Sequence, residues 1–382
     1  MKRALILSGG GARAAYQVGV LQALAKLLPP ETENPFPIIC GTSAGAINAI
    51  ALASHPGNFR EAVTSLAKIW QNLTIDQVYK HGWGDLLKGL GLLGFSLFNE
   101  GVGRQRPLSM LDNAPLWNLL GSSVRFENID RAIASGKLSA ISVTAMGYTS
   151  GESVSFFQGE PELKGWNRHR RIGLPTRLKL EHLLASSAIP TIFPAVRINR
   201  EYFGDGALRQ LAPISPALHL GAESVFVIGV SQNRDKRYKS KRSFIRHSPS
   251  MAQIVGQLFN SAFIDALEGD LEHLERINEL IELVPEDLRK PNQLPLRPVD
   301  NRVISPSRPV DNIAGRKVRY LPKSLRFFLK AIGATAKGGG ATAASYLLFH
   351  QSFIHELMEL GYQDTMWEAD SLKVFFGVDG KP

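Results

Sequence analysis

The sequence predicts an α/β fold with buried parallel strands, and three stretches carry that prediction. The short apolar run 4–7 is followed by a glycine loop and by a helical pattern of apolar residues at 14–24. The run 37–40 is likewise followed by a tight turn and the alanine-rich stretch 46–53. The run 225–230 is wholly apolar and rich in β-branched residues, which is typical of a buried parallel strand.

The stretches between these units alternate in pattern. Residues 58–79 carry apolar side chains at helical spacing. The stretch 81–103 is rich in glycine and leucine, which indicates a lid or a membrane-dipping segment, with a helix packed on the core as the alternative. Further on, the patterns predict paired strands at 139–146 and 153–157, a helix at 179–190, a hairpin at 193–203, a long helix at 249–283, a proline-rich surface arm at 285–316 and a last helix at 342–361.

Composition is that of a globular protein with room for a large core. The chain has 382 residues, of which 44% are hydrophobic and 20% charged. No apolar run reaches the roughly 18 residues of a membrane-spanning helix. The run 4–7 is too short for a secretory signal, and the single cysteine, Cys40, cannot form an intrachain disulfide. We therefore expect a cytoplasmic protein that also meets the inner face of the membrane.

The balance of charge is basic, at +10 from 44 Lys and Arg against 34 Asp and Glu. Basic residues gather at 168–171, 236–246 and 316–330. Such clusters suit a phospholipid surface or nucleic acid, and solvated loops explain each of them equally well. No nucleic-acid recognition motif accompanies the charge, so we expect no nucleic-acid partner. The sequence makes no prediction of oligomeric state.

The pentapeptide 41–45 is the strongest chemical signal. It has the form Gly-x-Ser-x-Gly, with Ser43 at its centre, between a strand pattern and a helix pattern. This is the arrangement of a nucleophile elbow, in which glycines flank a serine because the strand and the helix come too close for a β-carbon. The alternative is a Gly-Ser turn without chemistry.

The earlier glycine loop has two interpretations. Gly9, Gly11 and Ala14 satisfy a loose dinucleotide fingerprint, but the acidic residue that should end the next strand is missing. Glu31 and Glu33 lie instead in a proline-rich loop. Consecutive glycines before a helix can also point backbone N–H groups at one spot, which favours an oxyanion hole.

A serine nucleophile needs a base. His219, His247, His350 and His355 all lack the setting of a triad histidine after a strand. Asp205 follows the predicted hairpin in a tight turn before Gly206, so aspartate is the candidate base.

These motifs together resemble the patatin-like phospholipase family over about residues 4–230. The resemblance covers a glycine-rich loop, an elbow, an Asp-Gly-Ala turn and an Ala-Ser-x-Ala-x-Pro block. One departure is Ala14, where the family loop commonly has glycine. The quoted segments are Gly9-Gly10-Gly11-Ala12-Arg13, Gly41-Thr42-Ser43-Ala44-Gly45, Asp205-Gly206-Ala207 and Ala185-Ser186-Ser187-Ala188-Ile189-Pro190.

The resemblance implies a three-layer α/β/α sandwich with a mostly parallel sheet. It implies a catalytic domain at 1–233, with a lid insertion at about 80–110, and a mainly helical extension at 234–382 packed on the core. Ser43 and Asp205 would form a catalytic dyad that cleaves phospholipid or other lipid esters at a membrane surface, without metal or cofactor. The implied oxyanion hole comprises Gly9, Gly10, Gly11 and Ala44, and the supporting residues are Arg13, Gly41, Gly45 and Gly206.

Two other hypotheses remain open at this point. One is a membrane-binding module with a vestigial site, and the other is a nucleotide-binding enzyme of Rossmann type.

Overall fold

The structure is a computed structural model. It describes residues 2–96, 98, 107–232, 248, 250–261, 266–289, 297–331 and 340–378. The basic run 236–246 and part of the predicted lid, residues 97 and 99–106, lie outside the described residues.

A ten-stranded sheet with the path β10-β9-β1-β2-β3-β4-β6-β5 forms the centre of the molecule. β1 (Arg3–Leu7) lies between β2 (Ile38–Thr42) and β9 (Ser224–Ile228), parallel to both. β3 (Ala140–Gly147) is parallel to β2 and antiparallel to β4 (Ser153–Gly159). The other strands are β5 (Trp166–Arg168), β6 (Arg171–Pro175), β7 (Val196–Ile198), β8 (Glu201–Asp205) and β10 (Asp300–Ile304).

The side chains of β1 alternate between two cores, which makes the fold three-layered. Leu5 and Leu7 face a core built with α1 (Ala15–Leu27), α2 (Ala44–Ala53), α3 (Phe59–Asn72) and α15 (Gln351–Trp367). Ala4 and Ile6 face a second core built with α9 (Ser215–His219) and α11 (Ala266–Glu282). The predicted α/β/α sandwich with a mostly parallel sheet is confirmed.

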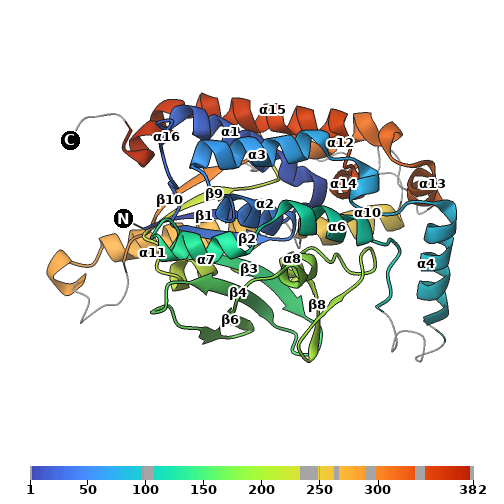
Figure 1. Cartoon of the computed structure of the whole chain (residues 1–382), viewed down its shortest axis with the longest axis horizontal. Coiled ribbons are helices and arrows are strands. Elements are labelled where there is room, and N and C mark those ends of the chain that lie inside the picture. The colour runs from blue at the N-terminus through green and yellow to red at the C-terminus, as the bar shows by residue number, and fades with distance from the viewer. Residues whose placement is uncertain are drawn as a thin grey trace.

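Further helices surround these layers (Figure 1). The longer ones include α4 (Trp83–Ser96), α6 (Ala114–Ser123), α7 (Glu127–Ala134), α8 (Leu180–Ser186), α10 (Met251–Asn260), α12 (Val310–Lys317), α13 (Lys323–Ala331), α14 (Gly340–Leu347) and α16 (Ala369–Phe376). No helix of the described ranges is long and apolar enough to cross a bilayer.

The prediction of a surface arm over 285–316 is wrong for its middle part. β10 pairs in parallel with β9 and extends the sheet, with Val303 opposite Val227. The sequence pattern does not predict this strand, because an edge strand pairs with a neighbour along one edge only and tolerates polar residues. Asp300, Asn301 and Arg302 are accordingly exposed or half-buried, while Ile304 is buried.

The C-terminal helix α15 runs along α1 on one side of the sheet (Figure 1). Glycines allow the two backbones to approach closely. A β-carbon on Gly19 would lie 1.8 Å from the Met358 carbonyl oxygen, and one on Gly361 would lie 2.2 Å from that of Tyr16. The C-terminal part of the chain is therefore packed directly on the first helix of the fold.

We expect Gly19→Ala to lower the free energy of unfolding by about 2 kcal/mol or more, because the methyl group would meet a backbone carbonyl that cannot rotate away. Gly269→Ala is the matched control. Gly269 is also helical, its β-carbon would meet no atom of the described residues within 4 Å, and alanine there should stabilise the helix by roughly 0.5–1 kcal/mol. Urea denaturation measures both, and equal effects of the two variants would contradict the close packing of α1 on α15.

Candidate active site

The elbow lies where β2 ends and α2 begins. Ser43 has φ 56° and ψ −130°, a conformation that costs a non-glycine residue of order 1–3 kcal/mol. A β-carbon on Gly41 would lie 2.5 Å from the Ala46 Cα, and one on Gly45 would lie 2.3 Å from the Leu7 carbonyl oxygen. Close contact between strand, turn and helix therefore requires both glycines and holds Ser43 in its strained conformation.

The structure brings Ser43 and Asp205 into direct contact. The Ser43 Oγ donates a hydrogen bond of 2.6 Å to the Asp205 Oδ2, and the Ala207 backbone N–H donates one of 3.0 Å to Oδ1. Asp205 ends β8, where it pairs with Ala145 of β3. The next residue, Gly206, passes so close to β3 that its β-carbon would lie 2.1 Å from the Thr144 carbonyl oxygen.

Asp205 is completely buried, and burial changes its acidity. The loss of hydration raises the pKa of its carboxyl group to about 7, against the opposing effect of the hydrogen bonds from Ser43 and Ala207. A carboxyl group with this pKa can accept and return a proton near neutral pH.

The residues of the predicted oxyanion hole fall into two places. Gly11, with φ +54°, and Ala44 line the same cavity as Ser43. Gly9 lines a different small cavity beside Cys40 and Thr42. The Gly10 carbonyl accepts a hydrogen bond from the Arg13 N–H. Of the four predicted donors, Gly11 and Ala44 therefore share a cavity with Ser43.

A buried polar network lies behind this loop, and the sequence motifs do not predict it. Gln17 donates to the Ser8 carbonyl at 2.8 Å, Asn48 donates to Gln17 at 2.9 Å, and Trp70 donates to Asn48 at 2.8 Å. The network ties the start of the glycine loop to α1, α2 and α3. Its signal in the sequence is weak: Asn48 is the one polar side chain of α2, whereas α1 carries Gln22 and Lys26 besides Gln17.

The sequence motifs include Ser186 in the block 185–190 but predict no role for this residue itself. Its hydroxyl accepts the backbone N–H of Ser43 at 2.8 Å and donates to the Thr144 carbonyl at 2.6 Å. The backbone N–H of Asp205 donates to the Ala188 carbonyl, two residues further on. The block 185–190 thus holds both members of the Ser43–Asp205 pair.

Arg13 is buried and bound by the C-terminal part of the chain. Its Nη2 donates to the Asp311 Oδ1 at 2.6 Å, its Nε donates to the Ser345 Oγ at 2.7 Å, and its guanidinium lies 4.3 Å from the centre of the Tyr346 ring. A β-carbon on Gly11 would lie 2.3 Å from the Tyr346 carbonyl oxygen. α12 and α14 therefore fix the glycine loop from outside.

An apolar cavity of about 60 Å³ opens beside Ser43. A neighbouring cavity of about 180 Å³ shares part of its wall. The shared wall consists of Ile47, Ile69, Trp70, Leu119 and Leu120. The mostly apolar lining of the cavity at Ser43 suits a hydrocarbon chain rather than a polar ligand.

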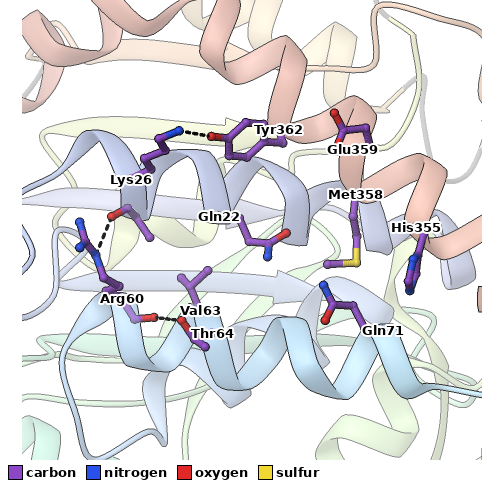
Figure 2. A pocket seen from close by; sticks show the side chains of 11 residues that line it. Gln22, Lys26, Arg60, Val63, Thr64, Gln71, His355, Met358, Glu359 and Tyr362 are labelled. Carbon is purple, nitrogen blue, oxygen red and sulfur yellow. Dashed lines mark hydrogen bonds between the residues drawn. The ribbon is translucent and has the colours of Figure 1, made fainter.

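A larger cavity, of about 700 Å³, lies between α1, α3 and α15 (Figure 2). It contains none of the predicted site residues, and its lining mixes polar and charged side chains with apolar surface. Lys26 donates to the Tyr362 hydroxyl across one end, and Arg60 donates to the Ala25 carbonyl. In the described part of the chain, no three acidic, histidine or cysteine residues gather in a way that could hold a metal ion.

The chain is similar in sequence to known phospholipases. The model of the patatin-like phospholipase family matches residues 5–218. A cGAMP-activated phospholipase from Pseudomonas aeruginosa is 30% identical over 217 residues, which are 56% of this chain and 55% of that protein. The matched segment thus spans about half the length of this curated relative.

Two solved structures are similar over nearly the whole chain. VipD from Legionella pneumophila has a TM-score of 0.33 at 14% identity, with 97% of this chain and 67% of that chain covered. Human GIVD cytosolic phospholipase A2, in complex with methyl gamma-linolenyl fluorophosphonate, has a TM-score of 0.43 at 12% identity, with 99% and 58% covered.

We expect Asp205→Asn to raise the free energy of unfolding at pH 8, by at most roughly 4 kcal/mol. The folded-state pKa of about 7 exceeds the ordinary 3.8, so ionisation of Asp205 destabilises the folded state increasingly from pH 4 to pH 7 and then by a constant amount. The gain should therefore shrink as the pH falls from 7 towards 4. Urea denaturation at several pH values measures it, and a variant less stable than wild type at pH 8 would contradict the burial cost.

We expect Asp311→Asn to lower the free energy of unfolding by roughly 1–3 kcal/mol, because it removes the charge that pairs with the buried Arg13 guanidinium. The cost is below that of a fully buried pair, since Asp311 is 35% exposed. Asp370→Asn is the control, because Asp370 is fully exposed where it faces Lys373. A denaturation midpoint for Asp311→Asn equal to that of Asp370→Asn would contradict the anchoring of the loop.

Proposed function

Because the chain belongs to the patatin-like phospholipase family, we propose that it is a serine acyl hydrolase that cleaves fatty-acyl esters of lipids through a Ser43–Asp205 dyad. The single observation that carries the proposal is the 2.6 Å hydrogen bond between these two side chains in a buried site. It supplies a nucleophile already bound to a base.

In the first step, the Asp205 carboxylate takes the Ser43 hydroxyl proton while Oγ attacks the ester carbonyl carbon. The carbonyl oxygen becomes an oxyanion, which the backbone N–H groups of Gly11 and Ala44 would stabilise, with Gly9 and Gly10 as the further predicted donors. Collapse of this intermediate breaks the bond to the alcohol, which leaves with the proton from Asp205. Ser43 then carries the acyl group.

In the second step, Asp205 takes a proton from water, and the resulting hydroxide attacks the acyl carbonyl carbon. The bond to the Ser43 Oγ breaks, the fatty acid leaves, and the proton returns to Oγ. The raised pKa of Asp205 supports both steps, because the carboxyl group must gain and lose a proton in each.

The lipid character of the proposed substrate rests on the apolar cavity at Ser43. Aromatic and aliphatic side chains from both halves of the chain line it, among them Trp70, Leu116, Phe193 and Phe349. An acyl chain in this space would place its ester carbon at the serine. We further propose that the substrate is phospholipid or a related ester and that the protein meets it in the cytoplasm, at the inner face of the membrane. The basic character of the chain favours binding to such a surface.

The two competing hypotheses fit the geometry less well. A vestigial site has no need of a strained serine and a buried carboxyl group, both of which cost stability. For a dinucleotide-binding enzyme, the strand after the first helix should end on an acidic residue, and β2 ends on Thr42 instead. The Tyr346 carbonyl also occupies the space beside Gly11 where a pyrophosphate would lie.

We expect Ser43→Ala and Asp205→Asn each to lower kcat/KM at least a thousandfold on dispersed short-chain esters and on phospholipid, because each removes one partner of the dyad. Released fatty acid is measured by mass spectrometry. Ser224→Ala is the control, since Ser224 is a buried serine at the start of β9, where it pairs with Arg3 at the beginning of β1.

The same assay tests the protonation state. Only ionised Asp205 can act as the base, so kcat/KM of the wild type should fall about tenfold per pH unit below about 7 and level off above it. Full activity of Ser43→Ala, or a rate independent of pH between 5 and 8, would contradict the proposed dyad.

A further inference from the structure

α4 and α13 meet at the end of the molecule opposite the two termini (Figure 1). Trp83 and Phe327 join them, with ring centres 5.6 Å apart, and the Ser324 hydroxyl donates to the His81 carbonyl at 2.6 Å. Both helices expose large apolar side chains here. We call this surface the α4–α13 face, and its residues are Trp83, Leu87, Lys88, Leu92 and Phe95 of α4 with Lys323, Phe327 and Lys330 of α13.

The exposed side of α4 is apolar far beyond what a surface helix needs. Leu87 is 63% exposed, Phe95 57%, and Phe327 on the neighbouring helix 64%. Gly84, Gly91 and Gly94 lie on the same helix, and β-carbons there would meet nothing within 4 Å in the described chain. Packing within the described chain therefore does not explain these glycines or the apolar side chains beside them.

The charge on this face is positive. Lys88, Lys323 and Lys330 are exposed, and none of them takes part in the ion pairs formed within the described ranges. The stretch 316–330, which includes all of α13 except Ala331, has six Lys and Arg residues and no acidic residue. Two of the six, Arg316 and Lys317, pair with Glu356. Asp85 is the single acid of α4. Aromatic and aliphatic groups among lysines are the composition of a surface that enters the headgroup region of an anionic bilayer.

The face is connected to the cavity at Ser43 by short steps. Gly89 of α4 packs against the Met110 carbonyl, and the backbone N–H groups of Met110 and Leu111 donate to the carbonyls of Thr191 and Ile192. The flanking residues Ile189 and Phe193 line the Ser43 cavity. The helix that carries much of this face is therefore joined through residues 110 and 111 to a segment of the cavity wall.

A second copy of the chain is the other candidate occupant, and the charges argue against it. A two-fold interface sets this face against a second copy of itself, so its lysines would be brought together with other lysines and with no added negative charge. An anionic bilayer pairs them instead. We propose that the α4–α13 face docks on anionic phospholipid membranes and so delivers lipid to the Ser43 cavity. This proposal rests on the proposed function for the delivery step alone.

Co-sedimentation of the full chain with vesicles tests the docking step. All variants carry Ser43→Ala, so that hydrolysis cannot alter the vesicles. We expect binding to vesicles of equal phosphatidylglycerol and phosphatidylcholine, and at least tenfold weaker binding to phosphatidylcholine alone. Leu87→Gln with Phe95→Gln should weaken binding at least tenfold, and Lys323→Gln with Lys330→Gln at least threefold.

Matched controls carry the same changes elsewhere. Trp367→Gln with Val374→Gln alters side chains that are 92% and 72% exposed near the C-terminus, and Lys68→Gln with Lys164→Gln removes two exposed charges. Both pairs should bind like the parent. Equal binding by the Leu87/Phe95 pair and its control would overturn the proposal, as would a dimer that dissociates in this pair while vesicle binding persists.

A conservative variant guards against misfolding. Brominated phospholipid in the vesicles should quench tryptophan fluorescence of the parent, and Trp83→Phe should remove most of that quenching while vesicle binding remains. Undiminished quenching in Trp83→Phe would overturn the docking of α4.

The active enzyme separates this inference from the proposed function. With Ser43 restored, the ratio of the rate on vesicles to the rate on dispersed short-chain ester should fall at least tenfold in the Leu87/Phe95 pair. An unchanged ratio overturns the delivery step, whereas absence of all ester hydrolysis in the wild type overturns the proposed function and leaves the vesicle-binding result to decide the docking.

Discussion

The hydrogen bond between the Ser43 hydroxyl and the Asp205 carboxyl group forms only because the rest of the structure holds these two residues together. It joins residues 162 positions apart in the sequence, and both side chains are buried. β3 makes the contact possible, because Thr42 of β2 pairs with Thr144 while Asp205 of β8 pairs with Ala145. Two neighbouring residues of one strand thus place the two partners.

The same contact is costly for stability. The backbone conformation of Ser43 costs of order 1–3 kcal/mol, and ionisation of Asp205 is costly because its carboxyl group is completely buried. Neither cost is offset by interactions of the turn alone. The Ser186 hydroxyl accepts from the Ser43 N–H and donates to the Thr144 carbonyl of β3. The large core that α1, α2, α3 and α15 build against the sheet supplies the stability that offsets the strain.

The sequence predicts most of the parts that depend on local backbone geometry. Gly41 and Gly45 mark a turn that is too crowded for a β-carbon, and the apolar runs of β1, β2 and β9 mark buried strands. It does not predict contacts between distant segments. Ser186, Gln17 and Asn48 stand in ordinary helical contexts, and their roles depend on what the tertiary fold brings to them. The sequence also does not predict β10, because edge strands lack a distinctive apolar pattern.

The site also crosses the division expected near residue 233. The family model ends at residue 218, yet Asp311, Ser345 and Tyr346 hold Arg13 at the end of the glycine loop. Tyr346 and Phe349 line the cavity at Ser43 together with Ile47 and Trp70. Because the Gly11 backbone packs against the Tyr346 carbonyl, the loop cannot change shape without a response from α14. The C-terminal segment therefore belongs to the candidate site, and the geometry of the glycine loop depends on how that segment folds.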